Sequence, residues 1–204
     1  QITVRVQKVK KNRIRMKLFF FAALAVLLLL ATIFAKQLCP YDPYAQDLAQ
    51  AMKPPSAAHL MGTDTYGRDM FSRVLIGAQT SISSTFALVA IITVFGTFVG
   101  VVCGYYGGRV DALVMRLSDL CLAFPGLVFA MAVAAILNGG VQNAVIALAL
   151  ISWPKYSRIA RSQTLSMKSL PYMQAAQLAG DSALQMIVRH VLPNIVGPIL
   201  VTSM

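Results

Sequence analysis

The stretch Leu170–Pro193, LPYMQAAQLAGDSALQMIVRHVLP, is too polar for a membrane span and too regularly apolar for a solvated loop. One helical stripe recurs at steps of three and four residues, and all of its members except Gln177 are apolar or small: Met173, Gln177, Gly180, Leu184, Ile187, Val188 and Val191. Small residues and a glycine let another protein surface approach closely, and Pro193 removes a backbone donor. The pattern predicts a cytosolic docking helix at about residues 170–190, which the proline ends or kinks.

The same stretch contains a spaced motif, formed by Gln174, Ala175, Ala176, Gly180, Leu192 and Pro193. This spacing resembles the cytosolic loop of importer permeases of the ATP-binding cassette (ABC) class, in which Glu-Ala-Ala is followed by Gly and then by Leu-Pro. Gln174 stands where that family usually has Glu. His190 replaces an aliphatic residue of the general pattern, as in the peptide and nickel subfamily. The alternative is an ordinary interfacial helix that ends at a proline.

A second motif lies in the connection before the second apolar run: Gly62, Thr63, Asp64, Gly67, Arg68, Asp69 and Arg73. These residues resemble the signature of one permease subunit of dipeptide, oligopeptide and nickel importers. Locally, we expect a turn in which Asp64 or Thr65 caps the next helix. Asp69 and Arg73 are spaced to pair on that helix, which we expect to lie along the outer membrane surface.

The composition places the chain in a bilayer and argues against enzymatic chemistry. Of its 204 residues, 57% are hydrophobic and 12% charged, and the mean hydropathy is +0.68. All seven acidic residues are aspartates, which removes glutamate-based hydrolytic chemistry. The three cysteines and two histidines have no metal-type spacing, so we expect no metal site and no catalytic residue.

The net charge of +11 is a topology signal rather than a sign of nucleic-acid binding. Seven of the 18 basic residues precede the first apolar run, and no acidic residue accompanies them. Basic segments flanking a span remain cytosolic, so we expect the N-terminus inside and the weakly acidic connection from Cys39 to Arg73 outside. Attraction of the basic tail to anionic lipid follows passively.

Uncharged runs predict the membrane spans. The predicted spans cover Leu18–Ala35, about Thr80–Gly104, Leu120–Leu137 and Val141–Tyr156, and a further span begins near Asn194. The uncharged part of the fourth span ends at Pro154, before Lys155. The alternative for the first run is a cleaved signal peptide, but the run is longer than a typical signal core and no small-x-small site follows it. We expect a basic tail (1–17), a first membrane helix (18–38), an external loop with an interfacial helix (39–79) and a permease domain (80–204).

Two features within the spans concern helix geometry. Gly96, Gly100 and Gly104 form a repeated G-x-x-x-G ridge, which predicts close helix packing. Pro125, followed by Gly126, predicts a kink in the third span. We expect residues 107–119 to form a short cytosolic loop between spans.

The resemblance implies an all-α, polytopic permease of the type I importer fold, with five to six spans in the full chain. Family members usually continue beyond residue 204, so we expect a fragment of a longer chain. The resemblance further implies a bacterial or archaeal cytoplasmic membrane, a second permease subunit, two cytosolic ATP-binding subunits that hold ATP and Mg, and an external solute-binding protein. This chain itself would need no cofactor. The solute would be a short peptide; nickel or a metal chelate is the alternative, and a non-transporting scaffold or sensor a more distant one.

Overall fold

The computed structural model describes the backbone of residues 2–203 and the side chains of residues 16–203. Most side chains of the predicted basic tail therefore lie outside the described residues. The chain divides into two compact units, Gln1–Ser83 and Ser84–Met204, and each is described by itself. The helix α3 contributes residues to both units.

The described chain is helical, and no strand is assigned within residues 2–203. In chain order the elements are α1 (Ile2–Ile33), α2 (Ala35–Leu38), η1 (Leu48–Gln50), α3 (Met70–Tyr106), α4 (Gly108–Ala123), α5 (Gly126–Ile136), α6 (Val141–Lys168), α7 (Pro171–Leu178), α8 (Ala183–Gln185), the π-helix η2 (Met186–Val191) and α9 (Leu192–Ser203). The predicted all-α membrane class is confirmed.

Three helices are long and apolar enough to cross a membrane: Met16–Ile33, Met70–Tyr106 and Ala183–Ser203. A fourth crossing would consist of α4 and α5 together, which are bent by 92° relative to each other. The helix α6 is not among these candidates, because its charge-free part ends at Pro154 and basic residues follow. By length and composition, the described residues thus provide three or four spans.

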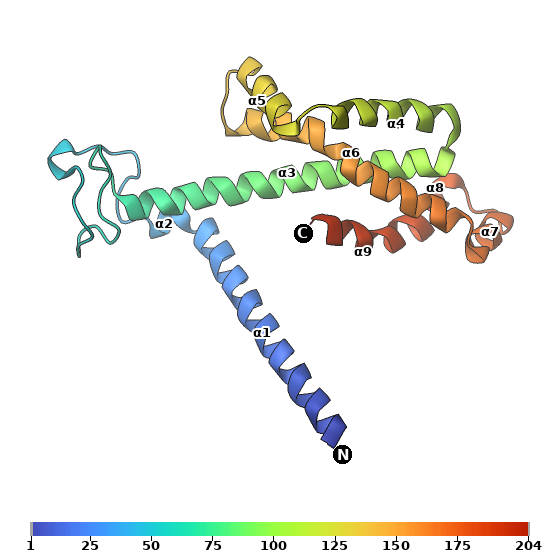
Figure 1. Ribbon diagram of the computed structural model, residues 1–204, viewed down its shortest axis with the longest axis horizontal. Helices are drawn as coiled ribbons and strands as arrows, with labels where there is room; N and C mark the ends of the chain where they lie inside the picture. The colour runs from blue at the N-terminus through green and yellow to red at the C-terminus, as the bar shows by residue number, and fades with distance from the viewer. Residues whose placement is uncertain (1, 204) are drawn as a thin grey trace. The chain divides into compact units, whose positions relative to one another are not determined.

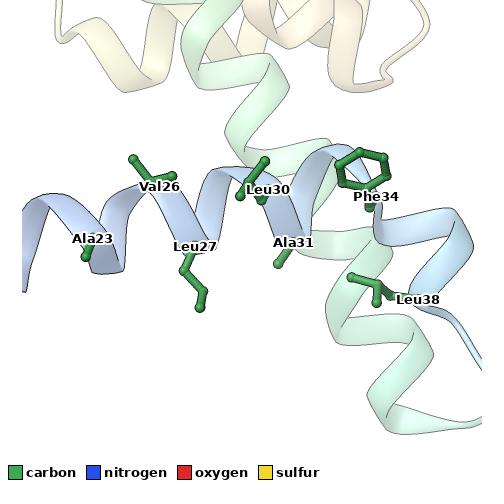
Figure 2. A pocket seen from close by; sticks show the side chains of 7 residues that line it. All are labelled: Ala23, Val26, Leu27, Leu30, Ala31, Phe34 and Leu38. Carbon is green, nitrogen blue, oxygen red and sulfur yellow. The ribbon is translucent and has the colours of Figure 1, made fainter.

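The first span exposes its apolar side chains. A shallow groove of about 590 Å³ follows α1 and α2, and Figure 2 shows the seven side chains that line it. All seven are apolar, among them Leu27, Leu30 and Phe34. Because a bilayer solvates apolar side chains as well as a protein core does, exposed leucines on this helix suit contact with lipid.

The helix α3 corrects the predicted boundary between an interfacial helix and the second span. It is continuous from Met70 to Tyr106, so no turn separates residues 70–78 from the apolar run after Thr80. No proline interrupts this segment, and Gly77 is the only glycine between residues 70 and 95. Its 37 residues extend about 55 Å, whereas an apolar bilayer core is about 30 Å thick. The helix therefore extends beyond the hydrocarbon layer.

The second unit is organised around α6. This helix packs against α4, α5, α7 and α9 (Figure 1). The buried core joins side chains from α3, α6, α7, η2 and α9: Ile92, Val101, Tyr156, Ala160, Met167, Met173, Met186, Val191, Ile195 and Ile199. The short helix α7 thus shares one core with two candidate spans, α3 and the segment that ends in α9.

Two predictions between the spans need correction. Residues 107–119 were expected to form a loop, but α4 begins at Gly108, because the left-handed conformations of Gly107 and Gly108 turn the chain within two residues. The third span is broken rather than kinked. Pro125 has an extended conformation and the helix restarts at Gly126, consistent with proline's missing donor and with its steric clash in a helix interior.

Candidate functional site

The predicted docking segment begins with α7, whose residues divide into an anchoring face and an exposed face. Leu170 is extended, as a residue before proline usually is, and Pro171 takes the first helical position. Met173 is only 2% exposed and belongs to the buried core. On the exposed face, Gln174 and Ala175 are accessible and Leu178 is 90% exposed. Ala176 is half-buried against the core.

The segment is not one continuous helix, which corrects the prediction for residues 170–190. After α7, Gly180 takes a φ of +94°, and an added Cβ atom would meet no atom within 4 Å. The N–H of Gly180 donates to the carbonyl of Gln177 and the N–H of Asp181 to the carbonyl of Ala176, which together form a Schellman cap. A left-handed backbone position therefore accounts for glycine at this motif position.

The turn after Gly180 is fixed by polar contacts that sequence analysis missed. Asp181 Oδ2 lies 3.0 Å from His190 Nε2, which connects the turn to η2. Ser182 and Gln185 form a capping box, in which each side chain accepts a hydrogen bond from the other residue's backbone N–H. The Ser-x-x-Gln pattern is a sequence signal that could have predicted this helix start. No sequence pattern indicated the pairing of Asp181 with His190.

The Leu192-Pro193 pair does not end the helix. The chain passes from α8 through the π-helix η2 into α9, which continues to Ser203. A π-helical turn shifts the hydrogen-bond pattern to i→i+5, and such turns occur where a regular helix is interrupted. The side-chain amide of Asn194 donates to the carbonyl of His190 at 2.7 Å. Leu192 packs against the core, so the pair joins the docking segment to the last candidate span.

The external motif builds a folded loop within the first unit. Asp64 accepts hydrogen bonds from the backbone N–H groups of Tyr66 and Arg68 and forms an ion pair with the Arg68 guanidinium at 2.7 Å. Arg73 approaches the same carboxylate at 3.7 Å. The Thr63 hydroxyl accepts a hydrogen bond from the N–H of Lys53 at 2.9 Å. The aspartate therefore organises the turn itself and does not cap the helix.

The motif glycines and Asp69 explain why the loop needs these residue types. Gly62 and Gly67 both have a φ of +73°, and a Cβ atom on Gly67 would lie 1.7 Å from the backbone oxygen of Asp47. Asp69 is 3% exposed and accepts a hydrogen bond from the N–H of Ser72, so it is the cap at the start of α3. Its other oxygen lies 2.9 Å from His59 Nδ1. The predicted pair of Asp69 with Arg73 is wrong, because Asp69 points back to the loop.

Both carboxylates have lowered pKa values. The hydrogen bond from the Arg68 side chain holds the pKa of Asp64 at about 2, below its ordinary 3.8. For Asp69, burial alone would raise the pKa, but the hydrogen bonds from Ser72 and His59 outweigh it and lower the pKa. Both groups are thus stabilised as anions in the folded loop.

We predict that the external loop loses stability in acid. A carboxylate with a lowered folded-state pKa stabilises the fold above its unfolded-state pKa, and this contribution disappears as the pH falls through the folded value. For Asp64 the loss should occur between about pH 4 and pH 2. Limited proteolysis of residues 39–69 across this range measures it. Asp64→Asn should show faster cleavage already at pH 7 and a flatter pH profile, and an unchanged profile in this variant would contradict the assignment.

The glycine ridge of α3 faces α6 within the second unit. A Cβ atom added to Gly96 would lie 2.7 Å from Tyr156 Cβ, and one on Gly100 would lie 2.2 Å from the backbone oxygen of Ser157. For Gly104 the nearest atom would be Thr164 Cβ, at 2.8 Å. The structure therefore places all three predicted packing residues at one helix interface, where they let the two backbones approach closely.

Ion pairs between α4 and α6 were also missed by sequence analysis. The Arg161 guanidinium binds both carboxylate oxygens of Asp111, and Arg158 contacts Asp119 and the hydroxyl of Ser118. The partners are about 40 to 50 positions apart, so no local pattern relates them. These contacts connect α4 to α6, the helix that packs against the glycine ridge of α3.

The chain's cysteines are free, and the described residues contain no group of three or more His, Cys, Asp or Glu side chains that could hold a metal ion.

Comparisons with known proteins agree with the membrane architecture. Residues 96–204 match the family model described as binding-protein-dependent transport system inner membrane component. The chain is 44% identical over 182 residues to a probable D,D-dipeptide transport system permease protein of Escherichia coli K12, covering 89% of this chain and 61% of that protein. It is 40% identical over 182 residues to a glutathione transport system permease protein of Pectobacterium atrosepticum, covering 88% of this chain and 60% of that protein. The chain thus spans about three fifths of the length of these relatives.

Proposed function

This chain belongs to the family of binding-protein-dependent transport system inner membrane components, the permeases of ABC importers, and from that membership we propose that it forms part of the path for short peptides. Two similar proteins are named for D,D-dipeptide and glutathione transport, and both solutes are short peptides. These names favour peptides over nickel or a metal chelate. The chain would act with a second permease and an external solute-binding protein.

The structural observation that best supports a role as an ATP-driven importer permease is the geometry of α7. Its buried Met173 anchors it in a core shared with α3, α6 and α9, while Gln174, Ala175 and Leu178 remain accessible on its surface. Burial of this exposed leucine in a groove of a partner would be favourable, and the small side chain of Ala175 beside it would allow close approach. We assign this face to a cytosolic ATP-binding subunit, with one such subunit for each of the two permeases. ATP and Mg would be held by those subunits.

The contacts around α7 suit it to transmit motion as a rigid lever. Met173 joins α7 to the core, the Schellman cap fixes its end, and the pair of Asp181 with His190 connects the following turn to η2. Displacement of α7 by closing ATPases would therefore move α6 and α9 rather than bend a flexible loop. Gln174 would supply a neutral hydrogen bond to the ATPase where related permeases usually have a carboxylate.

The proposed orientation places the N-terminus and α7 in the cytosol of a bacterial or archaeal cell. Basic residues precede the first span and recur at the end of α6 as Arg158, Arg161 and Lys168. The loop between α2 and α3 carries four aspartates against fewer basic residues and would lie outside. Motif and charge thus support the same orientation.

Transport by the reconstituted complex tests the proposal. The complete permease, with its partner permease and ATPases, is placed in proteoliposomes together with the binding protein. We expect ATP-dependent uptake of radiolabelled D-alanyl-D-alanine or glutathione, which excess unlabelled short peptide reduces at least tenfold and nickel does not. Uptake of nickel alone would replace the peptide assignment by the metal alternative. Intact insertion with neither uptake nor ATPase capture would refute the importer function and favour a scaffold.

A further inference from the structure

A small cavity lies beside α7 where four elements of the second unit meet. Its volume is about 260 Å³. It is lined by Tyr105 and Tyr106 at the end of α3, Lys168 at the end of α6, Met173 and Gln177 of α7, and Met186 of η2. The two methionines are 2% and 3% exposed, so the cavity has an apolar floor continuous with the core. The tyrosines, the lysine and the glutamine supply a polar surround.

The positively charged side chain in the lining of this cavity favours binding of an anion. Lys168 is the only charged residue among its lining side chains. Its Nζ atom lies 2.6 Å from the carbonyl oxygen of Tyr105 and 5.4 Å from the centroid of that tyrosine ring. These contacts hold the ammonium group at the cavity, and one hydrogen bond uses only one of its three donors. The amide of Gln177 adds neutral donors, so a phosphate group would be well matched.

The location of the cavity indicates where the phosphate would come from. No formal charge occurs between Arg73 and Arg109, so Tyr105 and Tyr106 mark the end of the uncharged part of α3. Tyrosine is enriched where a span meets the headgroup layer, because its ring is apolar and its hydroxyl is polar. A lipid headgroup at this depth would place its phosphate beside Lys168 and its glycerol and upper acyl carbons near the methionine floor.

We propose that this cavity binds the phosphodiester headgroup of an anionic phospholipid. Lys168 and Gln177 donate to the phosphate, and Met173 and Met186 contact the apolar part. The headgroup then connects the ends of α3 and α6 to α7, so lipid composition adjusts how firmly α7 is held. The inference rests on the cavity and on the proposed cytosolic orientation of α7, and it holds whether or not the solute is a peptide.

Lipid-dependent stabilisation of the purified, complete permease tests this site. Thermal unfolding is measured in detergent with added phosphatidylglycerol, phosphatidylcholine or inorganic phosphate, and native mass spectrometry counts the bound lipid. We expect phosphatidylglycerol to stabilise the protein more than phosphatidylcholine does. Lys168→Gln should weaken phosphatidylglycerol binding about tenfold, since a charge-assisted hydrogen bond is lost. Lys155→Gln removes an equal charge from an exposed position of α6 outside the cavity and should leave binding unchanged.

The readout is the difference between the two lipids within each variant, because loss of the Lys168 contact with Tyr105 also lowers stability by itself. Gln177→Leu provides a second test without altering that contact, and we expect it to weaken phosphatidylglycerol binding by a smaller factor. Equal binding by the native protein and by both cavity variants would overturn the proposal. Stabilisation by inorganic phosphate that depends on Lys168, without any preference for phosphatidylglycerol, would identify a free-anion site and overturn the lipid assignment.

Discussion

Gly100→Ala should be the most damaging single-methyl change in the glycine ridge. The added Cβ would lie 2.2 Å from the Ser157 backbone oxygen and 2.8 Å from Ala160 Cβ. Backbone atoms cannot rotate away as a side-chain end can, so α3 and α6 must separate and lose contacts along their interface. Overpacking typically costs about 1–3 kcal/mol, and we expect the upper end of this range, or a fall of about 5–10 °C in the unfolding temperature.

Gly77→Ala is the matched control for that substitution. Gly77 lies in the same helix, and a Cβ atom there would meet nothing within 4 Å. Alanine is favoured over glycine in helices by about 1 kcal/mol, so this variant should unfold at the same temperature or slightly higher. Thermal unfolding of the purified permease compares the two. Equal unfolding temperatures for both variants would contradict the close α3 and α6 interface.

Leu178→Asp should strongly weaken binding of the ATP-binding subunit. Leu178 is 90% exposed at the end of α7, beside the Gln174-Ala175 face assigned to the ATPase. Burying a leucine side chain contributes about 1.5–3 kcal/mol, and an unpaired carboxylate at the same position adds a desolvation cost. We therefore expect the affinity to fall about 100-fold and ATP-driven uptake to fall with it. Co-purification with the co-expressed ATPase, followed by titration in detergent, measures the loss.

Leu48→Asp makes the same chemical change at a second exposed leucine. Leu48 is 71% exposed in η1, within the loop assigned to the outside. It should retain ATPase capture at the native level. Both variants should insert in the membrane equally, since neither alters a candidate span or the buried core. Native-level capture by Leu178→Asp would show that α7 is not the docking element.

Local sequence properties were sufficient for the helical membrane class of the chain and for one of its packing faces. The uncharged run from Leu18 to Ala35 predicts its span. The free-energy cost of placing a charged side chain in hydrocarbon depends mainly on that residue itself, so the run can be recognised without knowing the rest of the fold. The four-residue spacing of the ridge at Gly96, Gly100 and Gly104 is also local, since it follows from the helical repeat. These patterns gave the all-α membrane class and the face of α3 that packs.

Boundaries between elements were less predictable, because competing local preferences are settled by tertiary contacts. The three- and four-residue spacing across Gly180 continued through the docking segment, yet the glycine takes a left-handed conformation and splits it into α7 and α8. The amphipathic pattern after Met70 suggested a separate surface helix, yet nothing in the backbone stops α3. Periodicity reports which residues share a face and is silent on where a helix ends.

The pairing of side chains depended on the folded chain. Asp69 was assigned to Arg73 because the two are one helical turn apart, but its cap position directs it to His59, and Arg73 approaches Asp64 instead. Likewise, Arg161 finds Asp111 only after α4 and α6 pack together. The amino-acid pattern specified how each segment interacts with water, lipid and its own helix. The choice of distant partners arose from packing, because an ion pair or a capping bond forms only between groups that the whole fold brings within about 3 Å of each other.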